Sequence, residues 1–205
     1  MHTGSVARVI AGEAGGRRLA VPDGRNTRPT SDRAREGLFA TVSSIAGSLA
    51  GLRVMDLYAG SGAVGIEALS RGAAHVLLVE SAAPALRVIR ANIEAVGLAG
   101  AEVAADRVER LLARAPAAEP GAATAAERRY DVVFADPPYA LPGAEVTRVL
   151  ELLAKHGWLA PEALVVIERA TRDGELTWPL GYQPDRARRY GEATFWYGLA
   201  PRDLR

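Results

Sequence analysis

The sequence predicts an α/β protein built on a largely parallel β-sheet. Three observations lead to this fold class: beyond Leu52, short apolar runs alternate with amphipathic stretches, glycine or proline separates them, and several apolar runs end in an acidic residue. Repeated strand–helix–strand units favour parallel strands joined by right-handed crossovers, with helices on both faces of the sheet. Ligands of such sheets bind outside the carboxyl ends of the strands, so functional residues are expected there.

Length and composition exclude several classes of protein. The chain has 205 residues, of which 49% are hydrophobic and 24% are charged, enough for a globular domain with a sizeable core. It has no cysteine, which excludes disulfides and thiolate metal sites and fits a reducing compartment. The start lacks the apolar segment of a signal peptide, and no stretch approaches the roughly 18 apolar residues of a membrane span. We therefore expect a cytoplasmic protein without a membrane segment.

The N-terminal part predicts a β-hairpin followed by a helix. Residues 6–11 and 17–22 are short apolar-containing runs joined by a glycine-rich loop. A lone hairpin is marginally stable in water, so this one must pack on a larger structure. An amphipathic helix should follow over residues 31–46, capped by Thr30 or Ser31.

Strand and helix patterns alternate through the rest of the chain. The expected strands lie at 52–58, 74–80, 101–106, from Tyr130 to the two prolines, and at 163–169. The expected helices lie at 62–72, at 84–96, between the third strand and about Arg114, and at 143–156. Residues 186–191 and 193–199 are spaced for an antiparallel hairpin, and the Ala/Pro/Gly-rich residues 115–127 predict a mobile loop.

Four expected strands end in an acidic residue: Asp56, Glu80, Asp106 and Asp136. Because the carboxyl ends of parallel strands share one edge of the sheet, these residues mark the edge where a ligand should bind. Acidic residues also cap helices, so capping of the following helices is the alternative interpretation.

A glycine-rich loop follows the first of these acids. Residues 56–65 read DLYAGSGAVG and contain a GxGxxG pattern, which is a weak signal by itself. Its glycines let the backbone approach a ligand, and the next helix offers free N–H groups. An acid at the strand end repels a dinucleotide pyrophosphate but suits the cationic amino acid end of S-adenosylmethionine. Glu80 would then accept the ribose hydroxyls and Asp106 would take the adenine amino group, while an NAD-dependent oxidoreductase stays open as the alternative.

The spacing D-x-x-x-G-x-G resembles the first motif of Rossmann-like methyltransferases. On this interpretation the cofactor is S-adenosylmethionine. Its candidate binding residues are Asp56, Tyr58, Gly60, Ser61, Gly62, Glu80, Ser81, Asp106 and Arg107.

The stretch YDVVFADPPY, residues 130–139, predicts a buried strand that ends in a stiff tip. Proline cannot donate to a sheet ladder, so the strand must stop at Pro137. A residue before proline is extended, so Asp136 and Pro137 should form a rigid, extended pair. A proline-terminated strand followed by a turn, with no catalytic role, is the alternative.

The sequence D-P-P-Y resembles the (D/N/S)-P-P-(Y/F) motif of methyltransferases that modify exocyclic amino groups of nucleobases. The Asp136 carboxylate and the Pro137 carbonyl can hold the two N–H bonds of an aryl amine, and Asp136 can stabilise charge that develops on nitrogen. Tyr139 can stack on the base, a contact worth about 1–3 kcal/mol. The candidate catalytic residues are Asp136, Pro137, Pro138 and Tyr139, and this chemistry needs no metal.

Positive charge gathers near the N-terminus. Residues 1–35 hold seven arginines and three acidic residues, although the whole chain has a formal net charge of only +1. A basic segment on a near-neutral body suggests contact with a polyanion. Lys155 is the only lysine, which indicates a general preference for arginine over lysine. This preference explains why arginine is frequent, but not why arginines cluster near the N-terminus.

Longer stretches resemble one family almost from end to end. RVIAGEAGGRRLAVP, RPTSDRAREGLFATV, VMDLYAGSGAVGIEALSRGA, VLLVE, YDVVFADPPY and GWLAPEALVVIE follow the order and spacing of the RsmD family, bacterial methyltransferases of guanine N2 in 16S ribosomal RNA. The resemblance covers roughly residues 6–199. It implies a Rossmann-like class I methyltransferase sheet of seven strands, the last two an antiparallel hairpin, with an N-terminal hairpin and helix extension. It also implies a basic RNA-contacting segment at 1–30 and a methyltransferase domain at 31–205.

The resemblance further implies a substrate, guanine 966 of 16S rRNA presented in the small ribosomal subunit, and a monomeric enzyme. The candidate RNA-binding residues are Arg8, Arg17, Arg18, Arg28, Thr30, Arg33 and Arg35. Arg28, Arg33 and Arg35 match the family pattern R-P-T-x-D-R-x-R, with an ion pair to Asp32 or Glu36 as the alternative. The family commonly has an aromatic and an extra basic residue at the hairpin tip, where this chain has Ala14 and Gly15.

Three other functions are weighed against this one. A DNA or RNA adenine-N6 methyltransferase would share the D-P-P-Y chemistry, but 205 residues leave no room for a separate target-recognition domain. An NAD-dependent oxidoreductase would leave D-P-P-Y and Asp56 unexplained. A non-catalytic RNA-binding protein with the same fold would not need the intact acidic strand ends.

Overall fold

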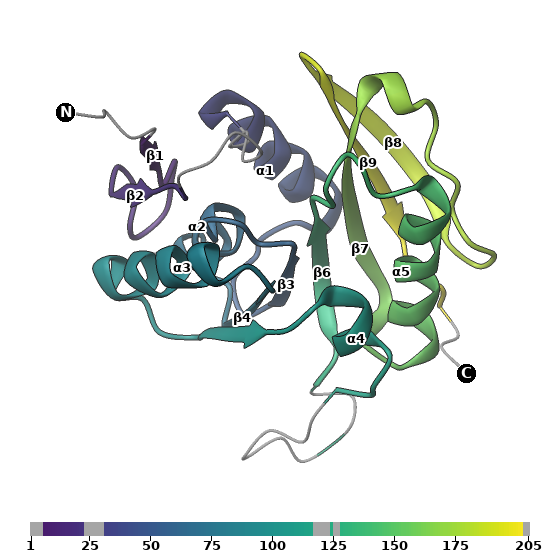
Figure 1. Cartoon of the computed structure of the whole chain (residues 1–205), viewed down its shortest axis with the longest axis horizontal. Coiled ribbons are helices and arrows are strands. Elements are labelled where there is room, and N and C mark those ends of the chain that lie inside the picture. Colours follow the sequence, from purple (N-terminus) through teal and green to yellow (C-terminus); the bar gives the residue numbers. More distant parts are fainter. Residues whose placement is uncertain (1–5, 23–30, 117–123, 125–127, 203–205) are drawn as a thin grey trace. The chain divides into compact units, whose positions relative to one another are not determined.

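In the computed structural model, seven strands form one mostly parallel sheet, in the order β5-β4-β3-β6-β7-β9-β8. Figure 1 draws the helices and strands along the chain. The structure describes residues 6–22, 31–116, 124 and 128–202. The chain divides into two compact units, Met1–Asp106 and Arg107–Arg205. The mixed sheet with its antiparallel C-terminal pair confirms the fold class that the sequence predicts.

The first unit contains three parallel strands and the helices between them. The strands are β3 (Arg53–Leu57), β4 (His75–Glu80) and β5 (Ala101–Ala105), and the helices between them are α2 (Ala63–Ser70) and α3 (Ala83–Val96). β3 and β4 are almost entirely buried, as their apolar runs predict for strands covered on both faces. Pro84 lies in the first turn of α3 and Gly97, at φ 67°, ends it, so both sequence signals are confirmed.

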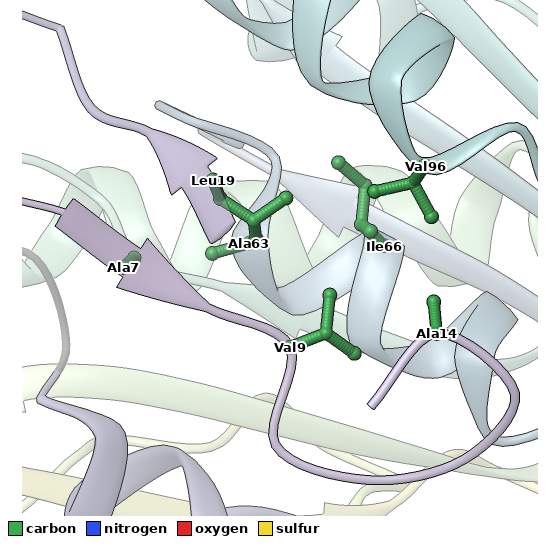
Figure 2. Close-up of a cluster of buried hydrophobic side chains, with 7 residues drawn as sticks. All are labelled: Ala7, Val9, Ala14, Leu19, Ala63, Ile66 and Val96. Carbon is green, nitrogen blue, oxygen red and sulfur yellow. The ribbon is translucent and has the colours of Figure 1, made fainter. Parts of the chain in front are cut away.

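The N-terminal hairpin packs into the core of the first unit. β1 (Val6–Arg8) pairs antiparallel with β2 (Arg18–Ala20), and the pairing continues where the Val9 N–H donates to the Arg17 carbonyl at 2.9 Å. Figure 2 shows its buried side chains beside those of α2 and α3. The shared cluster comprises Ala7, Val9, Ala14, Leu19, Ala63, Ile66 and Val96. The prediction that the hairpin needs a larger structure to pack on is confirmed.

The helix α1 (Asp32–Ala46) begins where the sequence predicts. Ser31 is its cap, and its hydroxyl oxygen accepts the N–H of Ala34 at 3.2 Å. Phe39 is fully buried, and the guanidinium carbon of Arg71, which directly follows α2, lies 4.7 Å from the centre of its ring. A cation–π contact therefore joins α1 to the end of α2.

Among the described residues, the second unit carries the remaining strands, two α-helices and a short 3₁₀ helix. They are α4 (Val108–Leu112), β6 (Tyr130–Ala135), α5 (Gly143–Lys155), β7 (Leu159–Ala170), the short 3₁₀ helix η2 (Thr171–Asp173), β8 (Gln183–Tyr190) and β9 (Ala193–Leu199). β6 and β7 are parallel, whereas β9 pairs antiparallel with both β7 and β8. The predicted C-terminal hairpin is thus confirmed.

Two strands begin earlier than the sequence predicts. β7 starts at Leu159 rather than at residue 163, because pairing with β6 continues through an irregularity around Pro161 and Glu162, which has φ 57°. β8 starts at Gln183 and includes Pro184, which is tolerated because β8 is the edge strand of the sheet. In both strands a proline near the first residue led the sequence pattern to predict a later start.

Among the residues described, no helix is both long and apolar enough to cross a membrane. The predicted loop at 115–127 falls largely outside the described residues, as do Arg28 and Thr30.

Candidate functional site

The glycine loop between β3 and α2 has a backbone that ordinary residues rarely adopt. Tyr58, Gly60 and Gly62 have φ angles of 60°, 57° and 76°. Positive φ costs glycine little, but at Tyr58 it is a local strain of the kind that clusters at functional sites. At Gly65 an added Cβ would lie 2.9 Å from side-chain atoms of both Val76 and Leu78. The glycines therefore shape the loop and let α2 pack closely on β4.

Asp56 lies next to this loop, within β3, and is only 5% exposed. Its Oδ2 accepts the N–H of Gly65 in the first turn of α2 at 2.9 Å. Burial raises the pKa of Asp56 from its ordinary 3.8 to about 7, the Gly65 hydrogen bond opposes the rise and the neighbouring Glu80 charge adds to it. Once ionised, a buried carboxyl at this place would favour a cationic ligand and repel a pyrophosphate at the same helix end.

Glu80, the last residue of β4, joins the glycine loop to the start of α3. Its Oε2 accepts the N–H of Gly60 at 3.0 Å. Its Oε1 accepts the N–H groups of Ser81 and Ala82 at 2.7 and 2.8 Å. The side chain is half-buried, so a strong acceptor lies at the edge of the loop, where the sequence predicts a ligand.

Asn92 of α3 also holds the loop, and no sequence pattern singled it out. It is 3% exposed, and its Nδ2 donates to the carbonyl of Ser61 at 2.9 Å. The same side chain exchanges hydrogen bonds with both backbone groups of Ala20 in β2, at 2.8 and 2.9 Å. One buried amide thus ties the glycine loop to the N-terminal hairpin.

The helix α2 and the hairpin are linked by two more buried polar side chains. Glu67, fully buried, accepts the N–H groups of Ile10 and Ala11 at 2.6 and 3.0 Å. The Ser70 hydroxyl accepts the N–H of Ala14 at 2.9 Å. A Cβ at Gly12 would lie 1.8 Å from the Ser70 carbonyl oxygen, so only glycine fits this contact. The hairpin is therefore anchored on the helix that follows the glycine loop.

The two remaining predicted cofactor residues lie at the end of β5. Asp106 directly follows the strand and is half-buried. Arg107 is the exposed cap residue of α4, and its Nε lies 3.8 Å from a carboxylate oxygen of Glu109. Asp106 thus lies at the carboxyl end of its strand, one residue beyond Ala105, which pairs with Glu80 of β4.

In the second unit, β6 ends at Ala135 and the D-P-P-Y tip follows, as the prolines predict. Asp136 and Pro138 are exposed, Pro137 is buried, and Tyr139 is 39% exposed. The N–H of Leu141 donates to the Pro138 carbonyl at 2.8 Å and closes a turn. The carboxylate and the ring are thus presented on a backbone that two prolines and a turn restrain.

A second residue that the sequence did not indicate supports this tip. Arg169, near the end of β7, donates to the Leu141 carbonyl at 3.0 Å and contacts the Pro138 carbonyl at 3.5 Å. The sequence shows only an arginine near the end of an apolar strand, and no motif there indicates a contact with the tip.

The predicted RNA-binding arginines differ in accessibility. Arg8, Arg17, Arg18 and Arg33 are exposed. The Arg8 Nε pairs with Asp32 at 2.9 Å, and the Arg17 guanidinium donates to the carbonyl of Val96.

Arg35 is the exception among these arginines. Its side chain is 1% exposed, and it bonds Asp32 at 2.9 Å and the Arg8 carbonyl. Arg35 therefore forms the ion pair with Asp32 that was the alternative to RNA contact, because it lies on the buried face of α1.

At the hairpin tip, Ala14 is 1% exposed and belongs to the hydrophobic cluster.

Within the described residues no group of three or more histidine, cysteine, aspartate or glutamate side chains is arranged to hold a metal ion.

The residues present in the first unit fit S-adenosylmethionine better than a dinucleotide. The buried Asp56 carboxyl accepts a backbone N–H at the start of α2, where a pyrophosphate would have to bind. Glu80 places a carboxylate acceptor at the edge of the loop, and Gly60 leaves open space there, since the nearest atom to an added Cβ is 3.9 Å away.

Comparison with known proteins gives a consistent result. Residues 7–198 match the family described as Conserved hypothetical protein 95. Ribosomal RNA small subunit methyltransferase D of Escherichia coli K12 is 33% identical over 195 residues, 95% of this chain and 90% of that protein. The protein of the same name from Haemophilus influenzae is 32% identical over 162 residues, 78% of this chain and 77% of that protein.

Solved structures share the fold. The yhhF protein of Escherichia coli has a TM-score of 0.80 at 28% identity and covers 97% of this chain and 100% of its own. A hypothetical protein of Thermus thermophilus has a TM-score of 0.72 at 33% identity, covering 96% and 99%. Magnesium protoporphyrin IX methyltransferase of Synechocystis, solved with bound S-adenosylmethionine, has a TM-score of 0.59 at 16% identity over 82% of this chain and 78% of its own, which shows a common fold.

Proposed function

We propose, from the premise that this chain belongs to the Conserved hypothetical protein 95 family, that it transfers a methyl group from S-adenosylmethionine to 16S ribosomal RNA. The match to the Escherichia coli methyltransferase confirms the family resemblance that the motifs predict. One observation carries the proposal: a relative 33% identical over 95% of this chain is named as a small-subunit rRNA methyltransferase.

The first unit would hold the methyl donor. S-adenosylmethionine supplies an electrophilic methyl group on a sulfonium sulfur. Asp56, once ionised, would attract the cationic amino acid end of that cofactor, and Glu80 would accept its ribose hydroxyls. Asp106, at the end of the next strand, would accept the adenine amino group. Tyr58, Gly60, Ser61 and Gly62 would supply the backbone wall, with Ser81 directly after Glu80. Arg107, the other candidate, follows Asp106 in the sequence and is the first residue of the second unit.

The D-P-P-Y tip of the second unit would hold the amine. An exocyclic amine is a poor nucleophile because its lone pair is delocalised into the ring. The Asp136 carboxylate and the Pro137 carbonyl would accept its two N–H bonds and favour the pyramidal form, whose lone pair is available. Asp136 would also stabilise the positive charge on nitrogen and take the proton that the amine loses. Tyr139 would stack on the base, a contact worth about 1–3 kcal/mol.

We further propose that the amine is N2 of one guanine, guanine 966 of 16S rRNA in the small ribosomal subunit. Arg8, Arg17, Arg18 and Arg33, which are exposed, would contact phosphates. Residues 1–30 would form the RNA-contacting extension, a functional segment rather than a separately folded part, because its hairpin shares the core of the first unit. A monomeric, cytoplasmic enzyme fits this role.

Methyl transfer from labelled S-adenosylmethionine tests the proposal. The substrates are small subunits lacking the modification, protein-free 16S rRNA, and DNA. Label should enter the small subunits. Label in DNA alone would contradict an rRNA substrate and favour the adenine-N6 alternative, and no label in any substrate would contradict a methyltransferase.

A further inference from the structure

We propose that Arg169 is a positioning residue for the catalytic tip: it clamps the turn after Asp136 so that the Asp136 carboxylate and the Tyr139 ring keep the geometry that holds the amine. This inference rests on the proposed function, in which that tip binds the base. It assigns a role to a residue outside the D-P-P-Y motif and 33 positions from Asp136.

Arg169 makes three contacts from a buried place. Its side chain is 8% exposed, near the end of β7. Nη2 donates to the carbonyl of Leu141 at 3.0 Å, and Nη1 lies 3.5 Å from the carbonyl of Pro138. Nη2 also pairs with Oδ2 of Asp173 at 2.9 Å. The two carbonyls belong to the ends of the turn that follows Pro137.

These contacts fall where the tip would otherwise be free to move. The proline rings fix φ at Pro137 and Pro138, but they leave ψ of Pro138 unrestrained. That torsion sets the direction of the Pro138 carbonyl, which receives the Leu141 N–H at 2.8 Å and faces Arg169. Tyr139 lies between the two clamped carbonyls, so the clamp sets where its ring leaves the backbone.

The guanidinium group suits this task because it is planar and presents several N–H donors in a fixed arrangement. A lysine at the same place has one nitrogen and cannot hold two carbonyls in a fixed relative orientation. Asp173 offsets the buried charge, and its helix η2 is itself anchored. The Thr171 N–H donates to the Glu192 carbonyl at 2.7 Å, and the hydroxyls of Thr171 and Thr194 lie 3.0 Å apart. The clamp is therefore fixed to β9.

The test compares Arg169→Gln and Arg169→Lys with two control variants. Arg172→Gln removes an exposed arginine of η2. Tyr182→Phe removes a buried hydroxyl that donates to the Leu150 carbonyl at 2.7 Å, and so destabilises the second unit away from the tip. We measure melting temperature, S-adenosylmethionine affinity, kcat and KM on the RNA substrate, and hydrogen exchange of the Leu141 amide.

For Arg169→Gln we expect kcat to fall by about tenfold or more, because small displacements of a reacting group are costly, with S-adenosylmethionine affinity unchanged within about twofold. The Leu141 amide should exchange faster, and Arg169→Lys should recover only part of kcat. Neither control should change kcat or Leu141 exchange, even where Tyr182→Phe lowers the melting temperature as much.

An unchanged kcat in Arg169→Gln, or a loss of kcat matched by an equally destabilised Tyr182→Phe, would overturn the inference. The inference would also be overturned if the Leu141 amide exchanged as slowly in Arg169→Gln as in the wild-type protein. These results are distinguishable from failure of the proposed function, which would show as no methyl transfer by the wild-type protein on any RNA.

Discussion

We expect the stability of the wild-type protein to fall as pH rises from acid to neutral, and replacing Asp56 with asparagine should remove this fall. The asparagine carbonyl oxygen can still accept the Gly65 N–H that Asp56 accepts at 2.9 Å, so the start of α2 keeps its partner. The carboxamide does not titrate. The change therefore isolates the ionisation of one buried group.

The sign and size of the effect follow from the pKa. Burial raises the pKa of Asp56 from 3.8 to about 7 in the folded protein, whereas the unfolded chain leaves it near 3.8. Between these values the folded protein keeps a proton that the unfolded chain has lost, so rising pH favours unfolding until about pH 7. A pKa difference of one is worth about 1.4 kcal/mol, so about 2.5 kcal/mol of wild-type stability should be lost between about pH 5 and pH 8.

Hydrogen exchange of the α2 amides is the suitable assay. The three tryptophans, at 158, 178 and 196, all lie in the second unit, so their fluorescence does not report the first unit directly. The protection of α2 in wild type minus that in Asp56→Asn, taken at each pH, cancels intrinsic exchange rates. Glu94→Gln, which removes an exposed carboxylate from the same unit, should keep the wild-type slope. A wild-type-to-Asn difference that is constant with pH would refute the argument that burial keeps Asp56 protonated.

Three further predictions concern the proposed sites. Asp136→Ala should abolish methyl transfer while S-adenosylmethionine affinity stays within about tenfold in a binding titration, because Asp136 serves the amine. Asn92→Ala should lower the melting temperature and weaken S-adenosylmethionine binding by about tenfold, since it frees the Ser61 carbonyl of a buried hydrogen bond. Replacing Arg17 and Arg18 together with alanine should weaken small-subunit binding and reduce the slope of log affinity against log salt by about 1 to 2.

Each of these has a result that would contradict it. Equal loss of cofactor binding and transfer in Asp136→Ala would place this residue in the cofactor site. Normal cofactor affinity in a destabilised Asn92→Ala protein would limit its role to packing of the hairpin. An unchanged salt slope would place the two arginines away from the RNA, and Arg87→Ala, on exposed α3 surface, is the matched control for loss of a positive charge.

The strand ends could be predicted from sequence because their signals are local. The runs before Asp56 and Glu80 are apolar and bounded by glycine or by acidic residues, and the structure shows them as buried strands. Pro137 had to end its strand, and β6 ends at Ala135. The same local logic failed at Pro161, where the chain continues β7 through an irregular backbone.

The supporting contacts could not be predicted because their partners are distant in sequence. Asn92 bonds Ala20 across 72 positions, and Arg169 reaches Leu141 across 28. Glu67 bonds Ile10 across 57 positions. A weak signal existed for Asn92, which follows Ile89 by three positions and precedes Val96 by four, on the apolar stripe of α3. A polar residue on such a stripe needs a buried partner, but the sequence does not say which.

The proposed activity is methylation of N2 of one guanine in small-subunit rRNA. The most direct test is mass spectrometry of nucleosides and mapped fragments from 16S rRNA after small subunits lacking the modification react with the protein and S-adenosylmethionine. We predict N2-methylguanosine in the fragment that contains guanine 966, and none with Asp136→Ala. Methyl on adenine N6 or cytosine N4, or on a different guanine, would contradict the account.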